Sequence, residues 1–429
     1  MSEVRGAHEL AAAVDQVLAS NREELLIGLC DFSMLGNWLM IAQECRLARD
    51  DEVHRDWHGL HWTGALTSEV YVQARHSGRG VLLLHAHGGS GEVPSLSKTD
   101  SNTVEEVLPH FGMLLPDVPH AYVVVNATHA AGWMQLGEER RALGRFKVVM
   151  TPIRTWASTS SSSEALPPRD QRQAAALGER GITQLRRSTI GIVGLGGAGS
   201  QVAEQLAHAG VGKLILVDGD VVKDVNLSRT HGTSPATVGH KKVQTAKAMV
   251  CRISPETKVD VVADSFPTRK LLTQLRDVDV LVTCVDGVQP RSELNRFALR
   301  YGIPLIDVGT TITPDPFQVD GHLSLVIPGS HCLRCAGHVS DALIQEEHEA
   351  GRQGRYGLNE GRPQVVSFNA LLASSAVTEV LKLITGFAGL VRGSRELHYD
   401  PVRGALRQVQ LAPGRCRECT WYGLRGDRA

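Results

Sequence analysis

The sequence has no excess of charge of either sign and no long apolar run. Its 45 Lys and Arg residues are balanced by 46 Asp and Glu residues, giving a net charge of −1. A near-neutral chain has no overall field that would draw it to nucleic acid or to an anionic membrane. Because no run of about 18 apolar residues occurs, no membrane-spanning helix is expected.

The N-terminus lacks the charged start and apolar centre of a secretory signal. Its first twenty residues, MSEVRGAHELAAAVDQVLAS, instead predict an amphipathic helix. We therefore expect a cytoplasmic protein, in a compartment where disulfides are rare. With 42% apolar and 21% charged residues, the 429 residues are enough for two or three globular domains.

The eight cysteines divide into two groups. Four isolated ones are expected to be buried, inert thiols: Cys30, Cys45, Cys251 and Cys284. The other four form two C-x-x-C pairs and predict a structural zinc site, which would hold the C-terminal tail in place; they are Cys332, Cys335, Cys416 and Cys419. A redox role is the alternative, although it would not require a second pair.

A Ser-rich stretch with two prolines predicts a linker over residues 157–169. It would separate a domain of residues 1–156 from a domain of residues 170–429. The first mixes helices and strands, and GALTSEVYVQARHSGRGVLLLHAHG is expected to hold two strands around a turn, which predicts an α+β domain. The second alternates short apolar runs with helical stretches, which predicts an α/β, doubly wound parallel sheet.

A glycine-rich loop between a predicted strand and helix indicates a nucleotide site. The segment GLGGAG fits G-x-G-x-x-G, in which the glycines allow the backbone to approach phosphates at a helix N-terminus; they are Gly194, Gly196, Gly197 and Gly199. Asp218 ends the next strand, where its carboxylate can accept hydrogen bonds from ribose hydroxyls. These features alone fit NAD as well as ATP.

Charged residues beyond this loop favour ATP. Arg229 follows the second strand, Lys242 lies on the next predicted helix, and Asp286 follows the strand VLVTCVD. Cations near a triphosphate, with an acidic ligand for Mg²⁺, neutralise charge on a leaving pyrophosphate. An NAD-linked oxidoreductase needs neither feature, but it remains the alternative for this loop.

The order G-x-G-x-x-G, D-x-D, N-L-x-R, G-x-x-K and D-G-x-x-x-R-x-x-x-N resembles the ThiF/MoeB group and the ubiquitin-activating enzymes. With SSAVTEVLKLITG and the two C-x-x-C pairs, the resemblance covers about residues 170–420. It implies a Rossmann-like domain that uses ATP and Mg²⁺ to adenylate the C-terminal carboxylate of a ubiquitin-like or sulfur-carrier protein. In the D-x-D motif of Asp218 and Asp220, Asp218 would hold the ribose, while Asn226, Arg229 and Lys242 would hold the triphosphate.

The same resemblance implies that Asp286 holds Mg²⁺. Arg172 is similar to an arginine that reaches into a partner subunit's ATP site, which implies a homodimer. Many relatives carry a nucleophilic cysteine after the last strands, but residues 309–331 and 336–368 contain none, and Cys284 lies in a predicted buried strand. We therefore expect the acyl group to pass directly to a thiol on another protein, such as a conjugating enzyme.

A histidine pair at a predicted strand end indicates a second metal site. His85 and His87 are two residues apart, so their rings share one face of the strand. Asp100 could add a carboxylate, giving the ligand set of a catalytic zinc with an open fourth position. Such a zinc lowers the pKa of its bound water, and a base must accept the proton. Glu24 is the candidate, with Glu23 as the alternative because the sequence leaves the strand phase open.

An upstream glutamate, then H-x-H, then S-x-x-D resembles the JAB/MPN (JAMM) metalloprotease family over about residues 10–155. This implies a cytidine-deaminase-like α+β fold, cleavage after ubiquitin-like tails, and stabilisation of the tetrahedral intermediate by Ser97. The sequence departs from the pattern at Gly88, where proline is usual, and in a His87-to-Ser97 spacing two residues longer. A fusion of two enzymes acting on one tail is expected; a catalytically inactive docking domain is the alternative.

Overall fold

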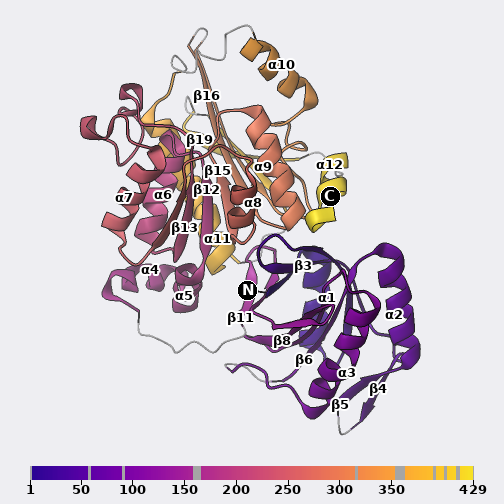
Figure 1. The fold of residues 1–429 in the computed structure, drawn as a ribbon. Coiled ribbons are helices and arrows are strands. Elements are labelled where there is room, and N and C mark those ends of the chain that lie inside the picture. Colours follow the sequence, from indigo (N-terminus) through magenta and orange to yellow (C-terminus); the bar gives the residue numbers. More distant parts are fainter. Residues whose placement is uncertain are drawn as a thin grey trace. The chain divides into compact units, whose positions relative to one another are not determined.

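The structure, a computed structural model, describes residues 2–56, 59–88, 92–157, 166–314, 317–352, 363–389, 393–400, 403–411 and 416–428. They form two compact units, one from residues 1–164 with 300–302 and 421–429, the other from residues 165–299 with 303–420. Figure 1 shows that each is a sheet flanked by helices. The Ser-rich part of the predicted linker, residues 158–165, lies outside the described residues.

The N-terminal unit contains a curled, nine-stranded mixed sheet with the order β11-β10-β1-β3-β2-β6-β7-β8-β9. A separate hairpin is formed by β4 and β5. The elements are β1 (Ser2–Gly6), α1 (His8–Ala19), β2 (Leu26–Ser33), β3 (Trp38–Leu47), β4 (Val53–Asp56), β5 (Gly59–Trp62), α2 (Gly64–Ser77), β6 (Gly80–Ala86), α3 (Lys98–Leu114), β7 (His120–Val125), β8 (Ala130–Leu136), β9 (Glu139–Ala142), β10 (Arg145–Val148), β11 (Arg154–Ala157) and the short η5 (Gly426–Arg428).

Helix α1 covers one face of this sheet, and α2 and α3 cover the other. Residues of β6 alternate between the two cores, because successive side chains of a strand point to opposite faces. Leu82 and Leu84 belong to the core with α1, whereas Val81 and Leu83 belong to the core with α2 and α3. The same alternation places His85 on the face covered by α2 and α3.

The prediction of one helix over the first twenty residues is wrong at its start. Residues 2–6 form β1, which pairs with β10 and β3 inside the sheet. Its buried Glu3 lies opposite Arg145, its carboxylate lies 2.6 Å from Arg5 Nε and 3.6 Å from Lys147 Nζ, and these cations hold the pKa of Glu3 below its usual range against the effect of burial. This long-range ion network accounts for a strand that local pattern does not indicate.

The segment GALTSEVYVQARHS was predicted to be a strand, and it is helix α2. Thr63 caps the helix by accepting a hydrogen bond from the Leu66 N–H, and Gly78 ends it in a left-handed conformation with φ of 62°. Leu66, Val70 and Ala74, spaced four residues apart, form its buried stripe. The capping residues and this spacing outweigh the strand preference of its β-branched residues.

The C-terminal unit contains an eight-stranded sheet with the order β14-β13-β12-β15-β16-β17-β18-β19. The first five strands are parallel, as predicted, and the last three add an antiparallel edge. The elements are η1 (Pro168–Asp170), α4 (Gln171–Leu177), α5 (Glu179–Arg187), β12 (Thr189–Val193), α6 (Gly197–Ala209), β13 (Lys213–Val217), η2 (Asp224–Asn226), η3 (Pro235–Thr237), α7 (Lys242–Ile253), β14 (Lys258–Val262), α8 (Arg269–Leu275), β15 (Val280–Thr283), α9 (Val288–Tyr301), β16 (Leu305–Pro314), β17 (Phe317–Val326), α10 (Asp341–Arg352), α11 (Val366–Thr385), β18 (Arg395–Asp400), β19 (Ala405–Val409) and α12 (Arg417–Tyr422).

The parallel strands follow the Rossmann order, with a topological switch point between β12 and β15. Helices α6 and α7 lie on one side of the sheet, and α8 and α9 lie on the other (Figure 1). Helix α11 packs against α6, β16 and β17. By length and composition α11 could cross a membrane, but half of its apolar window is buried inside the unit, as in a core helix.

Candidate functional site

The glycine loop lies between β12 and α6, at the carboxyl edge of the parallel strands. Gly194 has a φ of +88°, and a Cβ on Gly199 would collide with the Gly194 carbonyl oxygen, so both positions favour glycine. A Cβ on Gly197 would meet the Asn369 amide, whereas no atom lies within 4 Å of the Cβ position at Gly196. The loop therefore presents open backbone at a helix N-terminus, which suits phosphate groups.

Asp218, at the end of β13, fixes this loop. Its carboxylate accepts hydrogen bonds from the Leu195 N–H at 2.7 Å and from the Asp220 N–H at 2.8 Å. Lys242 Nζ lies 2.8 Å from an Asp220 carboxylate oxygen and 3.9 Å from one of Asp218. The D-x-D motif thus holds a lysine beside the loop.

The next predicted residues lie on the segment after β13. Asn226 is buried and its Oδ1 accepts a hydrogen bond from the Lys223 N–H, while Arg229 donates to the Val225 carbonyl at 2.6 Å. Arg172 is exposed on α4. In this structure Asn226 therefore has a local role in shaping its turn.

Asp286 is exposed just after β15, on the opposite side of the switch point from the glycine loop. A Cβ on Gly194 would lie 2.5 Å from the Cys284 carbonyl oxygen, so the segments after β12 and β15 meet here. The structure thus brings an exposed carboxylate and an open glycine loop to one edge of the sheet, where doubly wound folds bind ligands.

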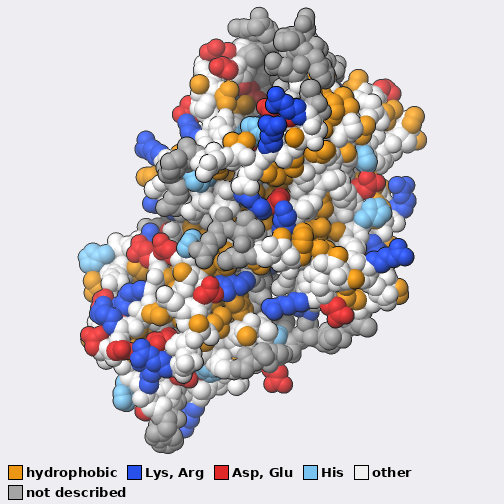
Figure 2. All heavy atoms as spheres, turned by 180° about the vertical axis from the view of Figure 1, so that it is seen from behind, with side chains coloured by type: hydrophobic (Ala, Val, Ile, Leu, Met, Phe, Trp, Pro, Cys, Tyr) orange, Lys and Arg blue, Asp and Glu red, His pale blue; other side chains and the backbone are white. Residues whose placement is uncertain are grey.

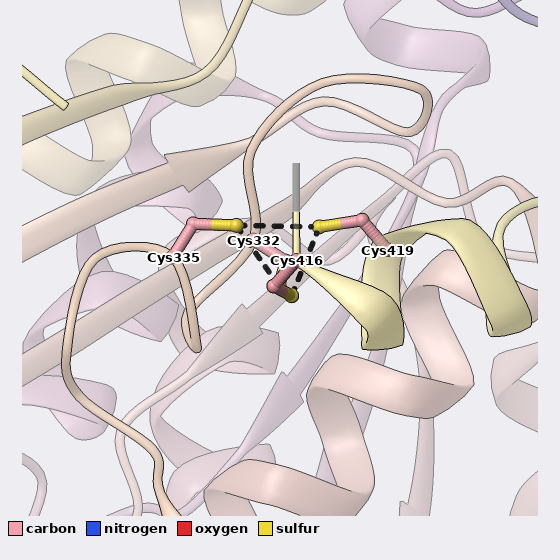
Figure 3. Close-up of side chains that lie close together, drawn as sticks. All are labelled: Cys332, Cys335, Cys416 and Cys419. Atoms are coloured by element: carbon pink, nitrogen blue, oxygen red, sulfur yellow. Dashed lines mark hydrogen bonds between the residues drawn. The ribbon is translucent and has the colours of Figure 1, made fainter. Parts of the chain in front are cut away.

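The four paired cysteines come together, as predicted (Figure 3). The recorded Sγ–Sγ separations run from 3.4 Å between Cys335 and Cys419 to 4.0 Å between Cys332 and Cys335. A tetrahedral zinc with bonds of about 2.3 Å places its sulfurs about 3.8 Å apart, whereas a disulfide requires about 2.05 Å. A hydrogen bond between Cys332 and Cys419 lowers the pKa of the Cys332 thiol and raises that of the Cys419 thiol, so Cys332 is the first of the pair to become a thiolate.

The N-terminal histidines and Asp100 also converge. His85 Nε2 lies 3.0 Å from His87 Nε2 and 3.1 Å from an Asp100 carboxylate oxygen, and His87 Nε2 lies 3.3 Å from the other oxygen. His85 and Asp100 are buried, and His87 is half-buried. Three ligand atoms therefore face one point at the junction of β6 and α3, and the donor set fits zinc.

The start of α3 positions this carboxylate. Ser97 caps the helix, its Oγ accepting a hydrogen bond from the Asp100 N–H at 3.1 Å, and an Asp100 oxygen accepts from the Ser97 N–H at 2.6 Å. Gly88, where the resemblance expects proline, is exposed with no atom within 4 Å of its Cβ position. Residues 89–91, which fall within the longer spacing from His87 to Ser97, lie outside the described residues.

Tyr122, on β7, is a site residue that the sequence reading missed. Its hydroxyl donates a hydrogen bond to Asp100 at 2.7 Å and lies 3.2 Å from His85 Nδ1. Burial and the neighbouring Asp100 raise the pKa of Tyr122, so it stays a donor. The contact to Nδ1 leaves His85 Nε2 facing the metal point. The tyrosine hydroxyl within the apolar run AYVVV was the signal available in the sequence.

The two candidate bases have different environments. The buried Glu24 carboxylate lies 2.7 Å from Arg22 Nε and 3.0 Å from Arg55 NH2. Glu23 is half-buried, and both its Oε2 and the Thr99 hydroxyl lie within 4 Å of the Cβ position at Gly59. Glu23 also adds to the effect of Asp100 in raising the pKa of His87. The charge of Glu23 thus acts on the candidate metal ligand His87.

Comparison with known proteins assigns the C-terminal unit. The model of the ThiF family matches residues 170–420, which is more than half of the 429 residues. The chain belongs to the ThiF family. Residues 170–420 are its ThiF-type adenylating domain, and this match leaves the preceding residues unassigned.

The relatives of this ThiF domain are distant. Molybdopterin-synthase adenylyltransferase of Escherichia coli is 28% identical over 243 residues, covering 56% of this chain and 90% of the relative. The adenylyltransferase and sulfurtransferase MOCS3 of Drosophila willistoni is 28% identical over 254 residues, covering 58% of this chain and 52% of MOCS3. A structure of E. coli MccB with MccA-N7isoASN is 20% identical, with a TM-score of 0.51 over 60% of this chain and 76% of that one, which establishes the fold alone. The chain thus spans most of the bacterial relative and about half of the fly protein.

The ThiF domain offers no reactive thiol at Cys284. Burial, with the nearby Asp307 and Asp286, raises the pKa of this thiol. A thiol that stays protonated is a poor nucleophile. The four free cysteines of the cluster have the spacing of zinc ligands rather than of a redox pair.

Proposed function

We propose that the chain uses ATP to adenylate the C-terminal carboxylate of a ubiquitin-like protein, sulfur carrier or peptide. A carboxylate oxygen attacks the α-phosphorus of ATP, forming a new P–O bond. The bond from the α-phosphorus to the bridging oxygen of the β-phosphate breaks, and pyrophosphate leaves. The observation that carries this proposal is the meeting of the open glycine loop and the exposed Asp286 at the switch point of the ThiF domain.

Three side chains would assist this reaction. Lys242, now held by Asp220, would move to the phosphates, since a triphosphate carries more negative charge than one carboxylate. Arg229 lies on the neighbouring segment and would add a second cation. Asp286 would hold Mg²⁺, which neutralises charge on the departing pyrophosphate. Because the pKa of the Cys284 thiol is raised, the acyl group would pass to a thiol of another protein. Membership of the ThiF family supports ATP over the NAD alternative.

We propose in addition that the chain acts as a homodimer. Hydrophobic side chains gather over the upper part of Figure 2, which is the ThiF domain. The exposed large apolar residues of this domain include Val366 and Leu371 on α11 and Leu406 and Val409 on β19. Burial of such a patch in a second subunit is favourable. The exposed Arg172 is free to reach a partner's ATP site, as its resemblance implies.

ATP–pyrophosphate exchange with a carrier protein of known C-terminus tests the adenylation proposal. Asp286→Ala is expected to lower the exchange rate at least about 100-fold, the scale of losing one electrostatic contact at a reacting phosphate. Asp260→Ala is the matched control, because Asp260 lies on the edge strand β14 and pairs with Lys213 at the surface. Full exchange in Asp286→Ala would reject the role of Asp286.

A second proposed function, zinc-dependent cleavage of the same tail, rests on the convergence of His85, His87 and Asp100. These three residues would hold zinc, which polarises a carbonyl and lowers the pKa of a bound water. Glu23 would accept the proton of the attacking water. The Ser97 oxygen already accepts from a backbone N–H, so its hydroxyl hydrogen is available to the developing oxyanion.

Metal content and cleavage distinguish this peptidase from an inactive docking domain. In a Cys332→Ser/Cys335→Ser background, which removes the four-cysteine site, the peptidase proposal expects His87→Ala to lower the bound zinc by one ion per chain and to stop cleavage of a tail fusion. His76→Ala is the control, because His76 is an exposed histidine on α2. Cleavage at an unchanged rate in His87→Ala would exclude zinc catalysis, and zinc binding without cleavage would favour docking.

A further inference from the structure

A third group of metal-binding side chains lies in the C-terminal unit, among residues that neither proposed activity uses. His338, Glu396 and His398 offer ligand atoms that all lie within 4.8 Å of one another. Glu396 Oε1 lies 2.7 Å from His338 Nε2 and 3.2 Å from His398 Nε2. We infer that these three residues bind a divalent transition-metal ion, for which Zn²⁺ is the best match.

The antiparallel edge of the sheet places two of the ligands. Glu396 and His398 are two residues apart on β18, so both side chains lie on the same face. In the pairing with β17, Ser324 lies opposite Glu396 and His322 lies opposite His398. Four polar side chains therefore share one face of a two-strand ladder.

The third ligand comes from the loop that carries the first cysteine pair. His338 follows Cys335 by three residues, and its N–H donates to the Leu333 carbonyl at 3.0 Å. Ser394, just before β18, donates its hydroxyl to the His331 carbonyl at 2.6 Å. The cysteine loop is thus tied to the start of β18, and this link brings His338 to Glu396.

The environment of Glu396 is the strongest indication of a bound cation. Its side chain is 2% exposed, and one oxygen accepts a hydrogen bond from the Ser324 hydroxyl. Within the part of the chain that the structure describes, its recorded ion-pair partners are His338 and His398. A buried carboxylate is costly unless a cation compensates it, and neutral imidazoles supply lone pairs rather than charge. A metal ion would satisfy all three groups.

The site has both an entrance and a supporting residue. His398 is 43% exposed, so an ion can enter from solvent and a water can complete the coordination. His322 donates from Nε2 to Asp307 at 2.9 Å, and its ring stacks on that of His338 at 3.8 Å. Since Asp307 holds His322, His322 positions the His338 ring. Two imidazoles and a carboxylate favour zinc over magnesium or calcium, which prefer oxygen ligands.

Zinc counting on the full chain tests this site. The background is His85→Ala/His87→Ala, in which the N-terminal histidines cannot bind metal while the four cysteines remain. After equilibration with micromolar zinc and gel filtration, we expect two zinc ions per chain in the background and one after adding His398→Ala or Glu396→Gln. Ser324→Ala should keep the site and weaken it by about 10–100-fold, the range for losing a hydrogen bond to a metal ligand.

His208→Ala is the matched control, because His208 is an exposed histidine in the last turn of α6. It should leave two zinc ions bound. Near-ultraviolet circular dichroism should be recorded before zinc is added. The spectrum of the exposed His398→Ala variant should match that of the background, which would show that the variant is folded and that any loss of zinc comes from the missing ligand. One zinc per chain in the background would overturn the inference, as would a second zinc that survives both His398→Ala and Glu396→Gln.

Discussion

Substitutions at the adjacent Glu23 and Glu24 should have different effects: one should lower the rate of tail cleavage, and the other should lower the free energy of unfolding of the N-terminal unit. The buried Glu24 carboxylate is engaged by Arg22 and Arg55, whereas the charge of Glu23 acts on the candidate metal ligand His87. If Glu23 is the base, Glu23→Gln removes the proton acceptor without disturbing the two arginines. The expected loss in tail cleavage is about 10²–10⁴-fold, the usual contribution of general base catalysis.

Glu24→Gln should have the opposite effect. It exchanges a charge-assisted hydrogen bond to the partly buried Arg55 for a neutral one, and such bonds contribute about 1.5–3 kcal/mol. The free energy of unfolding should fall by up to that amount, while the cleavage rate of the folded enzyme changes little. Tryptophan fluorescence during urea unfolding is a suitable measurement, because five of the six tryptophans precede residue 158.

The two measurements together can refute the reasoning. A fluorogenic tail fusion reports cleavage, and the same samples report unfolding. If Glu24→Gln abolishes cleavage at unchanged stability while Glu23→Gln cleaves at the full rate, then Glu24 is the base and the placement of Glu23 is irrelevant to catalysis. If neither variant affects cleavage of an active enzyme, neither carboxylate accepts the proton.

Three further predictions follow from single contacts. Tyr122→Phe should weaken zinc binding by the N-terminal unit about 10–100-fold in chelator competition, because it removes the hydrogen bond to a metal ligand; unchanged affinity would contradict this. Gly199→Ala should abolish pyrophosphate exchange and lower the free energy of unfolding by about 1–3 kcal/mol, since its methyl meets the Gly194 carbonyl, whereas Gly196→Ala, whose methyl meets open space, should leave the free energy of unfolding unchanged. Glu3→Gln should cost about 3–5 kcal/mol by leaving buried cations unpaired. Because the pKa of Glu3 is lowered in the folded state, this stabilisation should be present above its unfolded pKa of 4.5 and be lost as pH falls, measurable by urea titration.

The ThiF domain was predictable because its signals are local. The G-x-G-x-x-G loop lies between one strand and one helix, and the two C-x-x-C pairs carry their own spacing. The antiparallel edge of β17, β18 and β19 was not predicted, because alternation of helices and strands ends before it. The third group of metal ligands was not predicted either. His338 and Glu396 are 58 residues apart, and only the pairing of β17 with β18 and the cysteine loop bring them together.

The N-terminal unit was less predictable. The His85–His87 pair could be identified from strand periodicity, whereas Tyr122 comes from a neighbouring strand whose register the sequence does not contain. The choice between Glu23 and Glu24 depends on which one meets Arg55, which lies on the hairpin strand β4. The local sequence of β1 predicts part of a helix, because the strand's stabilising partners, Arg145 and Lys147, lie about 140 residues away.

The two proposed activities are chemically consecutive. Hydrolysis of a peptide or isopeptide bond after a tail leaves a free carboxylate, which is the group that adenylation consumes. A zinc hydrolase alone would also cleave any conjugate made from the activated tail, so the two reactions oppose each other unless they differ in substrate.

The order of the two reactions is testable with a tail extended beyond its last residue. Pyrophosphate exchange should begin only after cleavage, and His87→Ala should block exchange with the extended tail while leaving exchange with the pre-cleaved tail intact. Immediate exchange with the extended tail would show that the ThiF domain activates whatever carboxylate it receives, and would separate the two functions.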